Sequence, residues 1–396
     1  MRTVRPEEKA KHDDSLLRLR PERLASDGSA VAAAPDGAAV FVPGLLPGET
    51  ALVRLTEYKK NYRRGKIQRL LSAAPERQAP VCPLFGRCGG CHLQHLSYAA
   101  TLDWKRRWVE DALRRIGGVT AEVLPVYAAE RPWGYRNKAV LHWDGASLGF
   151  FAPRSRTVVP CDACALLPRA MNAALDTVKN ELAGQTPGSV ALRCGADGEL
   201  ACSLPGWADS LTAGVCGLVF QVGLTTFLQV NPAQTAVLYN TVLEWAELSG
   251  REKVWDLYSG AGVISLLLAA RAARVSAVEE NPSAVKEAWA NARRNGIDNA
   301  RFFTGKTETI LSRKPFTAER PDAVVADPPR AGLAPEVTEA LLTALPRRLV
   351  YVSCNPATLA RDAALLGRKY RLTAVRPVDM FCWCVDVETV SLFEAK

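Results

Sequence analysis

The chain is 396 residues long, and 48% of its residues are hydrophobic while 23% are charged. This balance is typical of soluble globular proteins and argues against a disordered or fibrous chain. The length predicts two or three domains with sizeable cores. No apolar run reaches the roughly 18 residues of a membrane-spanning helix, and the charged first 20 residues lack the apolar centre of a signal peptide. We therefore expect a cytoplasmic protein.

The net charge of +9 is compatible with a polyanionic partner, and its distribution is more informative than its size. Eight basic residues lie between Arg54 and Arg77 against two acidic ones, with Tyr58 and Tyr62 interleaved. Such a run is most often a solvated surface, and the interleaved aromatic rings make nucleic-acid contact the best alternative. Residues 59–69 and 136–138, together with the N-terminal barrel described next, are the candidate nucleic-acid-binding segments.

Turn signals divide the chain into four parts. Residues 1–14 are charged and aperiodic, which predicts a disordered lead. From 15 to 75, Pro-Gly and Asp-Gly pairs separate short apolar stretches, as in a small β-barrel. Residues 76–220 are rich in strands and loops, but region 98–116 has the period of an amphipathic helix, with Trp108, Val109 and Ile116 on the apolar face and Lys105 on the polar one. From 221 to 396, strands alternate with helices, which predicts a Rossmann-like α/β domain.

The chain contains 11 cysteines, which in a reducing compartment favour metal ligands over disulfides. Cys82, Cys88 and Cys91 have the spacing C-x5-C-G-G-C, and such a glycine-rich loop can wrap thiolates around an iron–sulfur cluster or a zinc ion. We favour the cluster, because zinc sites more often use paired C-x2-C motifs. Cys161 and Cys164 are alternative fourth ligands. We interpret the two histidines after the loop as surface residues and the remaining cysteines as packing residues.

The chemistry-bearing stretch is V-Y-V-S-C-N-P at 350–356, where an apolar strand ends in a polar turn that carries Cys354. Two other strands end in the same manner, in a glycine turn at 258–262 and in D-P-P-R at 327–330. The carboxyl ends of parallel strands meet at one edge of a sheet, so the three turns are predicted to line one crevice. A lone cysteine is usually a core residue, and these neighbouring turns make Cys354 a candidate nucleophile.

The glycine turn D-L-Y-S-G-A-G at 256–262 places backbone N–H groups at the start of a helix, where a ligand can approach. The dinucleotide fingerprint G-x-G-x-x-G is not met, because Ser265 stands at its third glycine position. Seventeen residues after Gly262, a second strand ends in Glu279, which suits a ribose-binding acid. The combination predicts S-adenosylmethionine bound near Gly260 and Glu279.

The D-P-P sequence that begins at Asp327 is similar to the motif of adenine and cytosine amino-methyltransferases, in which an aromatic residue follows the prolines. Here Arg330 stands in that place. The departure argues against methylation of an exocyclic amine, and such an enzyme has no need of the Cys354 nucleophile.

In order along the chain, these motifs resemble those of the RNA uracil-C5 methyltransferases, specifically the iron–sulfur branch that acts on 23S rRNA. The resemblance covers nearly the whole chain and includes F-V-P-G-L-L-P-G-E at 41–49, the cysteine loop, L-Q-V-N at 228–231, the three crevice motifs and V-E-T-V at 387–390. It implies a TRAM-type, OB-like barrel, a central iron–sulfur domain and a methyltransferase domain that uses S-adenosylmethionine.

The resemblance also implies particular site residues. The ligands of a 4Fe–4S cluster would be Cys82, Cys88, Cys91 and Cys164, the last because the family's fourth cysteine precedes a leucine-rich turn. The cofactor or base site would be lined by Gln229, Tyr258, Glu279 and Asp327. Ser259 stands where relatives often carry cysteine, and we expect no loss of function from it. Relatives that act on tRNA lack the cluster, so the cysteine loop favours rRNA.

The expected chemistry explains these residue types. Uracil C5 is a poor nucleophile, so the Cys354 thiolate first adds to C6 and makes an enolate whose C5 attacks the cofactor's methyl group. A base then removes the C5 proton so that the thiolate can leave, and the resemblance assigns this role to Glu388. We expect Asp327 to hydrogen-bond the uracil edge and Phe227 to stack on the ring, with the target base unstacked from its RNA.

Three alternatives stay open. The substrate could be tRNA rather than rRNA. A cytosine-C5 methyltransferase also uses a cysteine, but usually presents it after a proline, whereas Ser353 precedes Cys354 here. A non-catalytic iron–sulfur protein that binds RNA or carries electrons would have no use for the cofactor crevice. The expected partner is RNA and not DNA, and a monomer is the default expectation.

Overall fold

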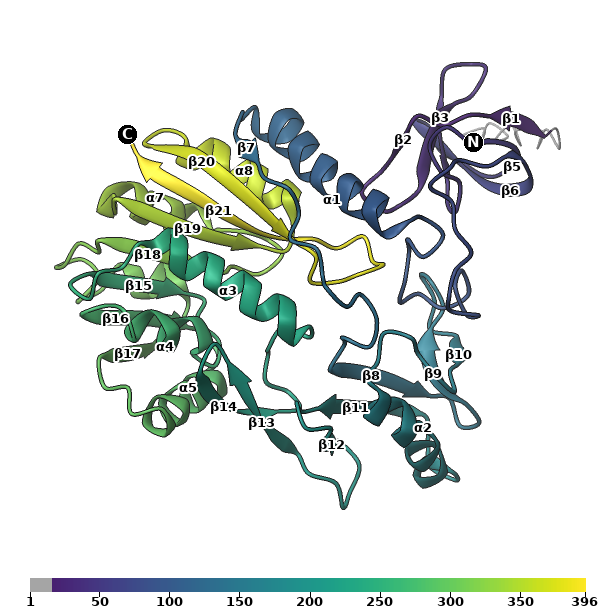
Figure 1. Ribbon diagram of the computed structural model, residues 1–396. Coiled ribbons are helices and arrows are strands. Elements are labelled where there is room, and N and C mark those ends of the chain that lie inside the picture. The colour runs from purple at the N-terminus through teal and green to yellow at the C-terminus, as the bar shows by residue number, and fades with distance from the viewer. Residues whose placement is uncertain (1–15) are drawn as a thin grey trace, which may run out of the picture. The chain divides into compact units, whose positions relative to one another are not determined.

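A computed structural model describes residues 16–396 of the chain (Figure 1). The lead expected at 1–14 lies outside these residues. The chain divides into two compact units: one runs up to Ala79 and includes His92–Ser97, and the other consists of Pro80–Cys91 and Tyr98–Lys396. Among residues 16–396, no helix has the length and apolar character that crossing a membrane requires.

The first unit is built on a six-stranded sheet in the order β1-β5-β6-β4-β3-β2. Its strands are β1 (Leu17–Leu19), β2 (Arg23–Leu24), β3 (Ala30–Ala33), β4 (Ala39–Val42), β5 (Thr50–Tyr58) and β6 (Tyr62–Ser72). The β5–β6 hairpin requires glycine at Gly65, because a Cβ atom there would lie 2.3 Å from Cγ1 of Val53. The expected all-β N-terminal domain is confirmed.

In the second unit, a five-stranded antiparallel sheet has the order β10-β9-β8-β11-β12. Its strands are β8 (Lys138–Trp143), β9 (Leu148–Phe151), β10 (Val158–Pro160), β11 (Gly188–Cys194) and β12 (Leu200–Cys202). Helix α2 (Arg169–Leu182) covers one face, where its Met171 and Val178 pack with Leu141 and Leu192 in a buried core. A separate hairpin, β13 (Ser210–Val215) and β14 (Leu218–Gly223), follows.

The same unit contains an eight-stranded sheet in the order β17-β16-β15-β18-β19-β21-β20-β7. These strands are β7 (Glu122–Val123), β15 (Lys253–Leu257), β16 (Arg274–Glu279), β17 (Ala300–Thr304), β18 (Ala323–Ala326), β19 (Arg348–Ser353), β20 (Tyr370–Val378) and β21 (Glu388–Ala395). The strands from β17 to β19 run parallel, and β21 is antiparallel to both neighbours. The chain order reverses between β15 and β18, and α/β sheets bind ligands at the carboxyl ends of strands at such a point.

Helices cover both faces of this sheet (Figure 1). One face carries α3 (Pro232–Ala246), α4 (Val263–Ala269) and α5 (Pro282–Arg294), and the other carries α1 (Tyr98–Ala112), α6 (Thr307–Leu311), α7 (Pro335–Ala344) and α8 (Pro356–Leu366). Alternate strand residues enter opposite cores, as Val254 and Trp255 do. The predicted Rossmann-like α/β fold is confirmed.

Helix α1 occupies the region predicted to be amphipathic and continues as a π-helical turn, η1 (Leu113–Gly117). Trp108 and Val109 are buried as expected, but Ile116 is 56% exposed. Lys105, which we placed on the polar face, is fully buried, because its amine pairs with the carboxylate of Asp379. The partner is 274 residues away in the chain, so the helical period alone could not reveal it.

Candidate active site

Cys354 is held in a short turn between β19 and α8. The side chain of Asn355 caps α8 by accepting a hydrogen bond of 3.0 Å from the N–H of Ala357. The Asn355 N–H in turn donates to the Ser353 hydroxyl at 3.1 Å. Cys354 therefore stands half-buried at the end of a buried strand, with the residues on either side fixed. This is the position that the sequence predicted for it.

Glu388 begins the antiparallel strand beside Cys354. Ser353 is the register partner of Thr389, whose hydroxyl donates to the Ser353 carbonyl at 3.1 Å. Glu388 is only 4% exposed. Cys354, the predicted nucleophile, and Glu388, the predicted base, are the chain neighbours of this register pair. The two residues therefore lie at the same edge of the sheet.

The charge of Glu388 acts on the Cys354 thiol, which indicates that the two groups lie close together. Burial raises the pKa of the Cys354 thiol to about 11, helped by the negative charge of Glu388 and opposed by the Arg330 guanidinium. Burial likewise raises the pKa of Glu388 to about 8, with further contributions from Asp327 and Asp386, and Arg330 again opposes the shift. Arg330 itself pairs with Asp386 at 3.0 Å.

Two more carboxyl groups, the half-buried Asp327 and the fully buried Asp256, complete the acidic edge. Asp327 follows β18, and its N–H donates to the Leu257 carbonyl at 3.2 Å, which ties the D-P-P turn to the end of β15. Burial raises the pKa of Asp327 to about 7 and that of Asp256 to about 7. From α3, the phenol of Tyr239 has its pKa raised by burial and by the charges of Asp327, Glu388 and Asp256. Helix α3 therefore packs beside the acidic edge.

The glycine turn after β15 has left-handed backbone at Tyr258 (φ 67°), Gly260 (φ 54°) and Gly262 (φ 83°). A Cβ at Gly262 would lie 2.9 Å from Ala288 Cβ, so glycine is required there for space as well as for conformation. A Cβ at Gly260 would meet nothing within 4 Å, so the backbone is open to a ligand at that point. The left-handed conformation of Tyr258 is strained for a residue with a side chain, as is common at binding sites.

The acid and the turn that were predicted to bind the cofactor lie together. The Gly260 N–H donates to Glu279 Oε2 at 2.9 Å, and the Asn281 N–H donates to Glu279 Oε1 at 2.8 Å. Ser259 Oγ and Asp256 Oδ1 are buried without a hydrogen-bond partner in the described part of the chain. Unpaired buried polar atoms beside an open turn fit a bound polar ligand such as S-adenosylmethionine.

The remaining predicted residues of the site lie on the segment before α3. Gln229 is buried, with 5% of its surface exposed, whereas Phe227 is 69% exposed. Asn231 caps α3 and also donates to the Met380 carbonyl at 3.3 Å. An exposed aromatic ring on an otherwise anchored segment is available for stacking.

The cysteine loop lies near the other two candidate ligands. The charges of Cys82 and Cys88 add to burial in raising the pKa of Cys164, and they do the same to Cys161, which reaches about 12. Cys91 and Cys164 pack against the same buried cluster of apolar and aromatic residues. However, no three His, Cys, Asp or Glu side chains within residues 16–396 are arranged to hold a single metal ion. His95, interpreted as a surface residue, is instead buried in the first unit.

The basic hairpin of the first unit, β5–β6, has part of its positive charge neutralised by acidic residues of the same unit. Arg63 pairs with Asp36, Lys59 pairs with Glu57 at 3.2 Å, and Arg64 pairs with Glu57 at 3.5 Å. Arg64 also lies over the rings of Phe41 and Tyr62, at 5.9 and 5.8 Å from their centroids. Exposed basic side chains on the hairpin include Lys60, Lys66 and Arg69.

Sequence reasoning did not assign site roles to Asp256, Tyr239, Arg330 or Asp386. Asp256 opens the glycine-turn motif, and its place inside a strand of apolar residues was the available signal. Asp386 lies two residues before Glu388, but nothing in the sequence shows that it would pair with Arg330. Tyr239 could not be found, because a tyrosine on a buried helix face is ordinary core material.

Known proteins resemble this chain in both sequence and architecture. A family described as tRNA (Uracil-5-)-methyltransferase matches residues 217–396, and the TRAM domain family matches residues 18–67. An uncharacterized RNA methyltransferase of Halalkalibacterium halodurans is 35% identical over 97% of this chain and 98% of its own. Another, from Caldanaerobacter subterraneus, is 35% identical over 91% of this chain and 94% of its own.

A solved structure shows the likeness in three dimensions over most of the chain. The tRNA (uracil-54, C5)-methyltransferase of Pyrococcus abyssi, in complex with S-adenosyl-L-homocysteine, superposes with a TM-score of 0.77 at 25% identity. The match covers 95% of this chain and 99% of that one. The chain therefore belongs to the RNA uracil-5 methyltransferase family, with a TRAM domain, and methylates uracil C5 in RNA at the expense of S-adenosylmethionine.

Proposed function

We propose that this enzyme methylates C5 of a uridine in 23S rRNA through a covalent Cys354–uracil adduct, with Glu388 as the general base. The observation that carries the proposal is the pairing of β19 with β21, which sets Ser353 opposite Thr389 and so brings Cys354 and Glu388 to one edge. A nucleophile and a base on adjacent strand ends suit a reaction in which both act on neighbouring ring carbons.

The reaction divides between the two residues. The thiol of Cys354 first loses its proton, and the thiolate sulfur then bonds to C6 while the C5–C6 electrons move toward O4 as an enolate. C5 then takes the methyl group from S-adenosylmethionine and leaves S-adenosylhomocysteine. Glu388 accepts the C5 proton, the C6–sulfur bond breaks, and the ring double bond returns. Asp327 follows β18, has its pKa raised to about 7 and would hydrogen-bond the uracil edge, and Phe227 would stack on the ring.

S-adenosylmethionine is assigned to the glycine turn, where it supplies the methyl group. Glu279, fixed by the N–H groups of Gly260 and Asn281, would accept hydrogen bonds from the ribose hydroxyls. Tyr258 and Gln229 would line the same site. The open space at Gly260 and the unpaired Ser259 hydroxyl support this assignment.

The four cysteines Cys82, Cys88, Cys91 and Cys164 are proposed to hold a 4Fe–4S cluster. In a cubane cluster each thiolate binds a separate iron, so its ligands need not converge on one point. The charges of Cys82 and Cys88 both raise the pKa of Cys164, which supports a common site for these thiolates. Visible absorbance of anaerobically purified protein, with iron, sulfide and zinc analysis, tests this point: stoichiometric zinc without iron would contradict it.

The choice of rRNA rests on the cysteine loop, and a specific observation favours the alternative. The structural relative from Pyrococcus abyssi is named as a tRNA (uracil-54, C5)-methyltransferase. The deciding experiment offers unmodified 23S rRNA and tRNA together with methyl-labelled S-adenosylmethionine, followed by nucleoside digestion. Label in 5-methyluridine from 23S rRNA supports the proposal. Label in tRNA alone would show that the substrate is tRNA. Label in 5-methylcytidine would contradict uracil as the methylated base.

A further inference from the structure

The loop of residues 379–387 joins β20 to β21 and ends at Glu388. Val378, the last residue of β20, is the direct register partner of Glu388. Asp379 follows immediately, so whatever holds Asp379 also sets where the hairpin closes and where Glu388 begins β21. The conformation of this loop is therefore part of the geometry of the proposed base.

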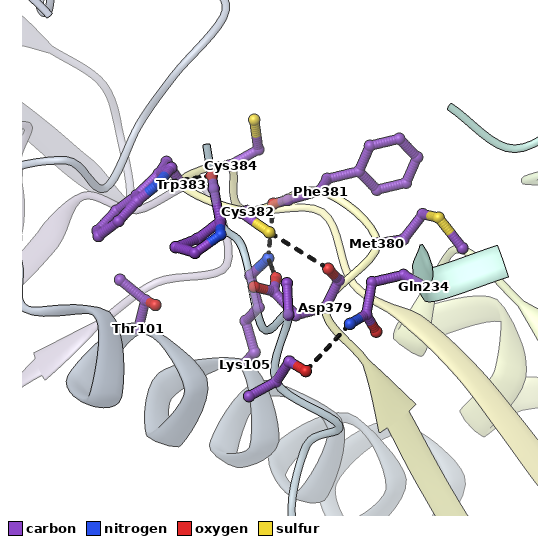
Figure 2. A network of polar contacts seen from close by, with 12 residues as sticks. Thr101, Lys105, Gln234, Asp379, Met380, Phe381, Cys382, Trp383 and Cys384 are labelled. Carbon is purple, nitrogen blue, oxygen red and sulfur yellow. Dashed lines mark hydrogen bonds and ion pairs between the residues drawn. The ribbon is translucent and has the colours of Figure 1, made fainter. Parts of the chain in front are cut away.

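Asp379 is clamped by two side chains from α1. Lys105 Nζ lies 2.5 Å from Asp379 Oδ1, and the Tyr98 hydroxyl donates to Oδ2 at 2.7 Å. Figure 2 shows Lys105 pointing from its helix into the loop, where its amine also donates to the Phe381 carbonyl at 2.9 Å. The side chains of Lys105 and Asp379 are 0% and 1% exposed.

Further contacts hold the rest of the loop. The Asn231 amide donates to the Met380 carbonyl at 3.3 Å, and the Tyr135 hydroxyl donates to the Cys382 carbonyl at 3.1 Å. At the far end, the Cys384 thiol donates to the carbonyl of Gly90, inside the cysteine loop, at 3.0 Å. One loop thus connects α1, the segment before α3 and the cysteine loop with the start of β21.

A buried ion pair of this kind is weak evidence for stability. Removing two charges from water costs several kcal/mol for each ion, and apolar replacements of buried pairs are often neutral or stabilising. What a buried pair does provide is a single arrangement, because an amine and a carboxylate that cannot reach water must find each other. The pair is therefore suited to fixing one conformation of the 379–387 loop, which Glu388 directly follows.

We propose that Lys105 and Asp379 are positioning residues for Glu388, which hold the 379–387 loop so that the Glu388 carboxylate meets the C5 proton of the methylated adduct. This inference rests on the proposed role of Glu388 as base. It predicts a selective defect: without the clamp, thiol addition and methyl transfer persist, but proton removal slows, and the covalent RNA–enzyme adduct accumulates. A purely structural pair would weaken every step together.

The experiment compares Asp379→Asn and Lys105→Met with wild type and with Glu388→Gln. Covalent adduct is read on a denaturing gel after mixing with RNA and S-adenosylmethionine, and turnover and cofactor affinity are measured in parallel. Arg106→Met is the matched control, because Arg106 is the next residue on α1 but makes an exposed pair with Glu110 at 2.9 Å. We expect both clamp variants to accumulate adduct and to lose roughly 10- to 100-fold in turnover, with cofactor affinity and Arg106→Met unchanged.

The outcomes separate this inference from the function on which it rests. If Glu388→Gln traps adduct but the folded clamp variants do not, or if they turn over normally, the positioning role is wrong. If Glu388→Gln traps none, the base assignment fails and the inference fails with it. Should either single variant fail to fold, the double variant Lys105→Met/Asp379→Leu replaces the pair by apolar side chains and gives the same test.

Discussion

Ser353 and Thr389 are register partners across β19 and β21, and the Thr389 hydroxyl donates to the Ser353 carbonyl. The residues next to them, Cys354 and Glu388, consequently share one sheet edge although they are 34 positions apart in the sequence. Because β21 runs antiparallel to β19, its first residue, Glu388, lies beside the turn that follows β19 and carries Cys354.

Replacing Cys354 by alanine should abolish methyl transfer and spare cofactor binding. The thiol lies after β19, whereas the proposed cofactor contacts are in the turn after β15, at the end of β16 and at Gln229 before α3. We expect turnover to fall by a factor of about 10⁴ or more, as for other nucleophile deletions, and the affinity for S-adenosylhomocysteine by calorimetry to change less than about twofold. Turnover retained in Cys354→Ala would remove this residue from the mechanism, and Cys202→Ala, a buried cysteine in the five-stranded sheet, serves as the control.

The pH profile should report the ionisation of Glu388. Because its pKa is raised to about 8, the carboxyl is mainly protonated at neutral pH in the free enzyme and must ionise to act as a base. We expect kcat/KM to rise with pH between about 6 and 9. The charge of Asp386 contributes to the raised pKa, so Asp386→Asn should shift the rise toward lower pH. A flat profile, or a shift toward higher pH in Asp386→Asn, would contradict the assignment.

Arg330 should assist both groups through its charge. The guanidinium opposes the upward pKa shifts of Cys354 and Glu388, so Arg330→Met should raise both values and lower the ionised fractions near neutral pH. The side chain is 73% exposed, so solvent screening keeps the effect modest. We expect a several-fold loss of kcat/KM near pH 7.5 that narrows at higher pH, whereas Arg330→Lys keeps most activity. A loss that is equal at every pH would point to RNA contact instead of pKa control.

The fold was predictable because its signals are local. Strand ends with polar turns and regular helix periods identified the α/β sheet and put Cys354, Asp327 and the Gly260 turn at one edge. Glu388 was found only through the resemblance, since an acid at the start of a strand has no local mark. Lys105 was predicted on the polar face of its helix, and Arg63 was counted only as one of the basic residues. In each case the side chain pairs with an acid that is distant in the sequence. Pairings of this kind depend on the tertiary fold and leave no period in the sequence.

The basic hairpin should contain separable sets of residues. Lys60, Lys66 and Arg69 are exposed, whereas Arg63 is engaged with Asp36. Replacing the three exposed side chains by glutamine should weaken RNA binding and reduce the slope of log K against log salt by about one for each lost phosphate contact. Arg63→Gln should change the slope less. An unchanged slope in the triple variant would mean that this face is only solvated, and fluorescence anisotropy over a salt series makes the measurement.

Glu388→Gln should stabilise the protein, and more so as the pH rises. Burial raises the folded-state pKa from 4.5 to about 8, so between these values the folded protein holds a proton that the unfolded chain has released. The free energy of unfolding therefore falls as the pH rises through this window, by up to a few kcal/mol. Glutamine removes this term, so the Tm of the variant should exceed that of wild type by roughly 2–5 °C at pH 9 and differ little at pH 5.

The control for this pH-dependent stabilisation is Glu130→Gln, a change at an exposed position that should leave the Tm difference independent of pH. If Glu388→Gln gained no stability between pH 5 and 9, the carboxyl would have to be ionised in the folded protein near neutral pH. The expected gain instead means that the enzyme holds a destabilising carboxyl beside Cys354. A loss of stability in exchange for activity is expected where a catalytic base is buried away from water.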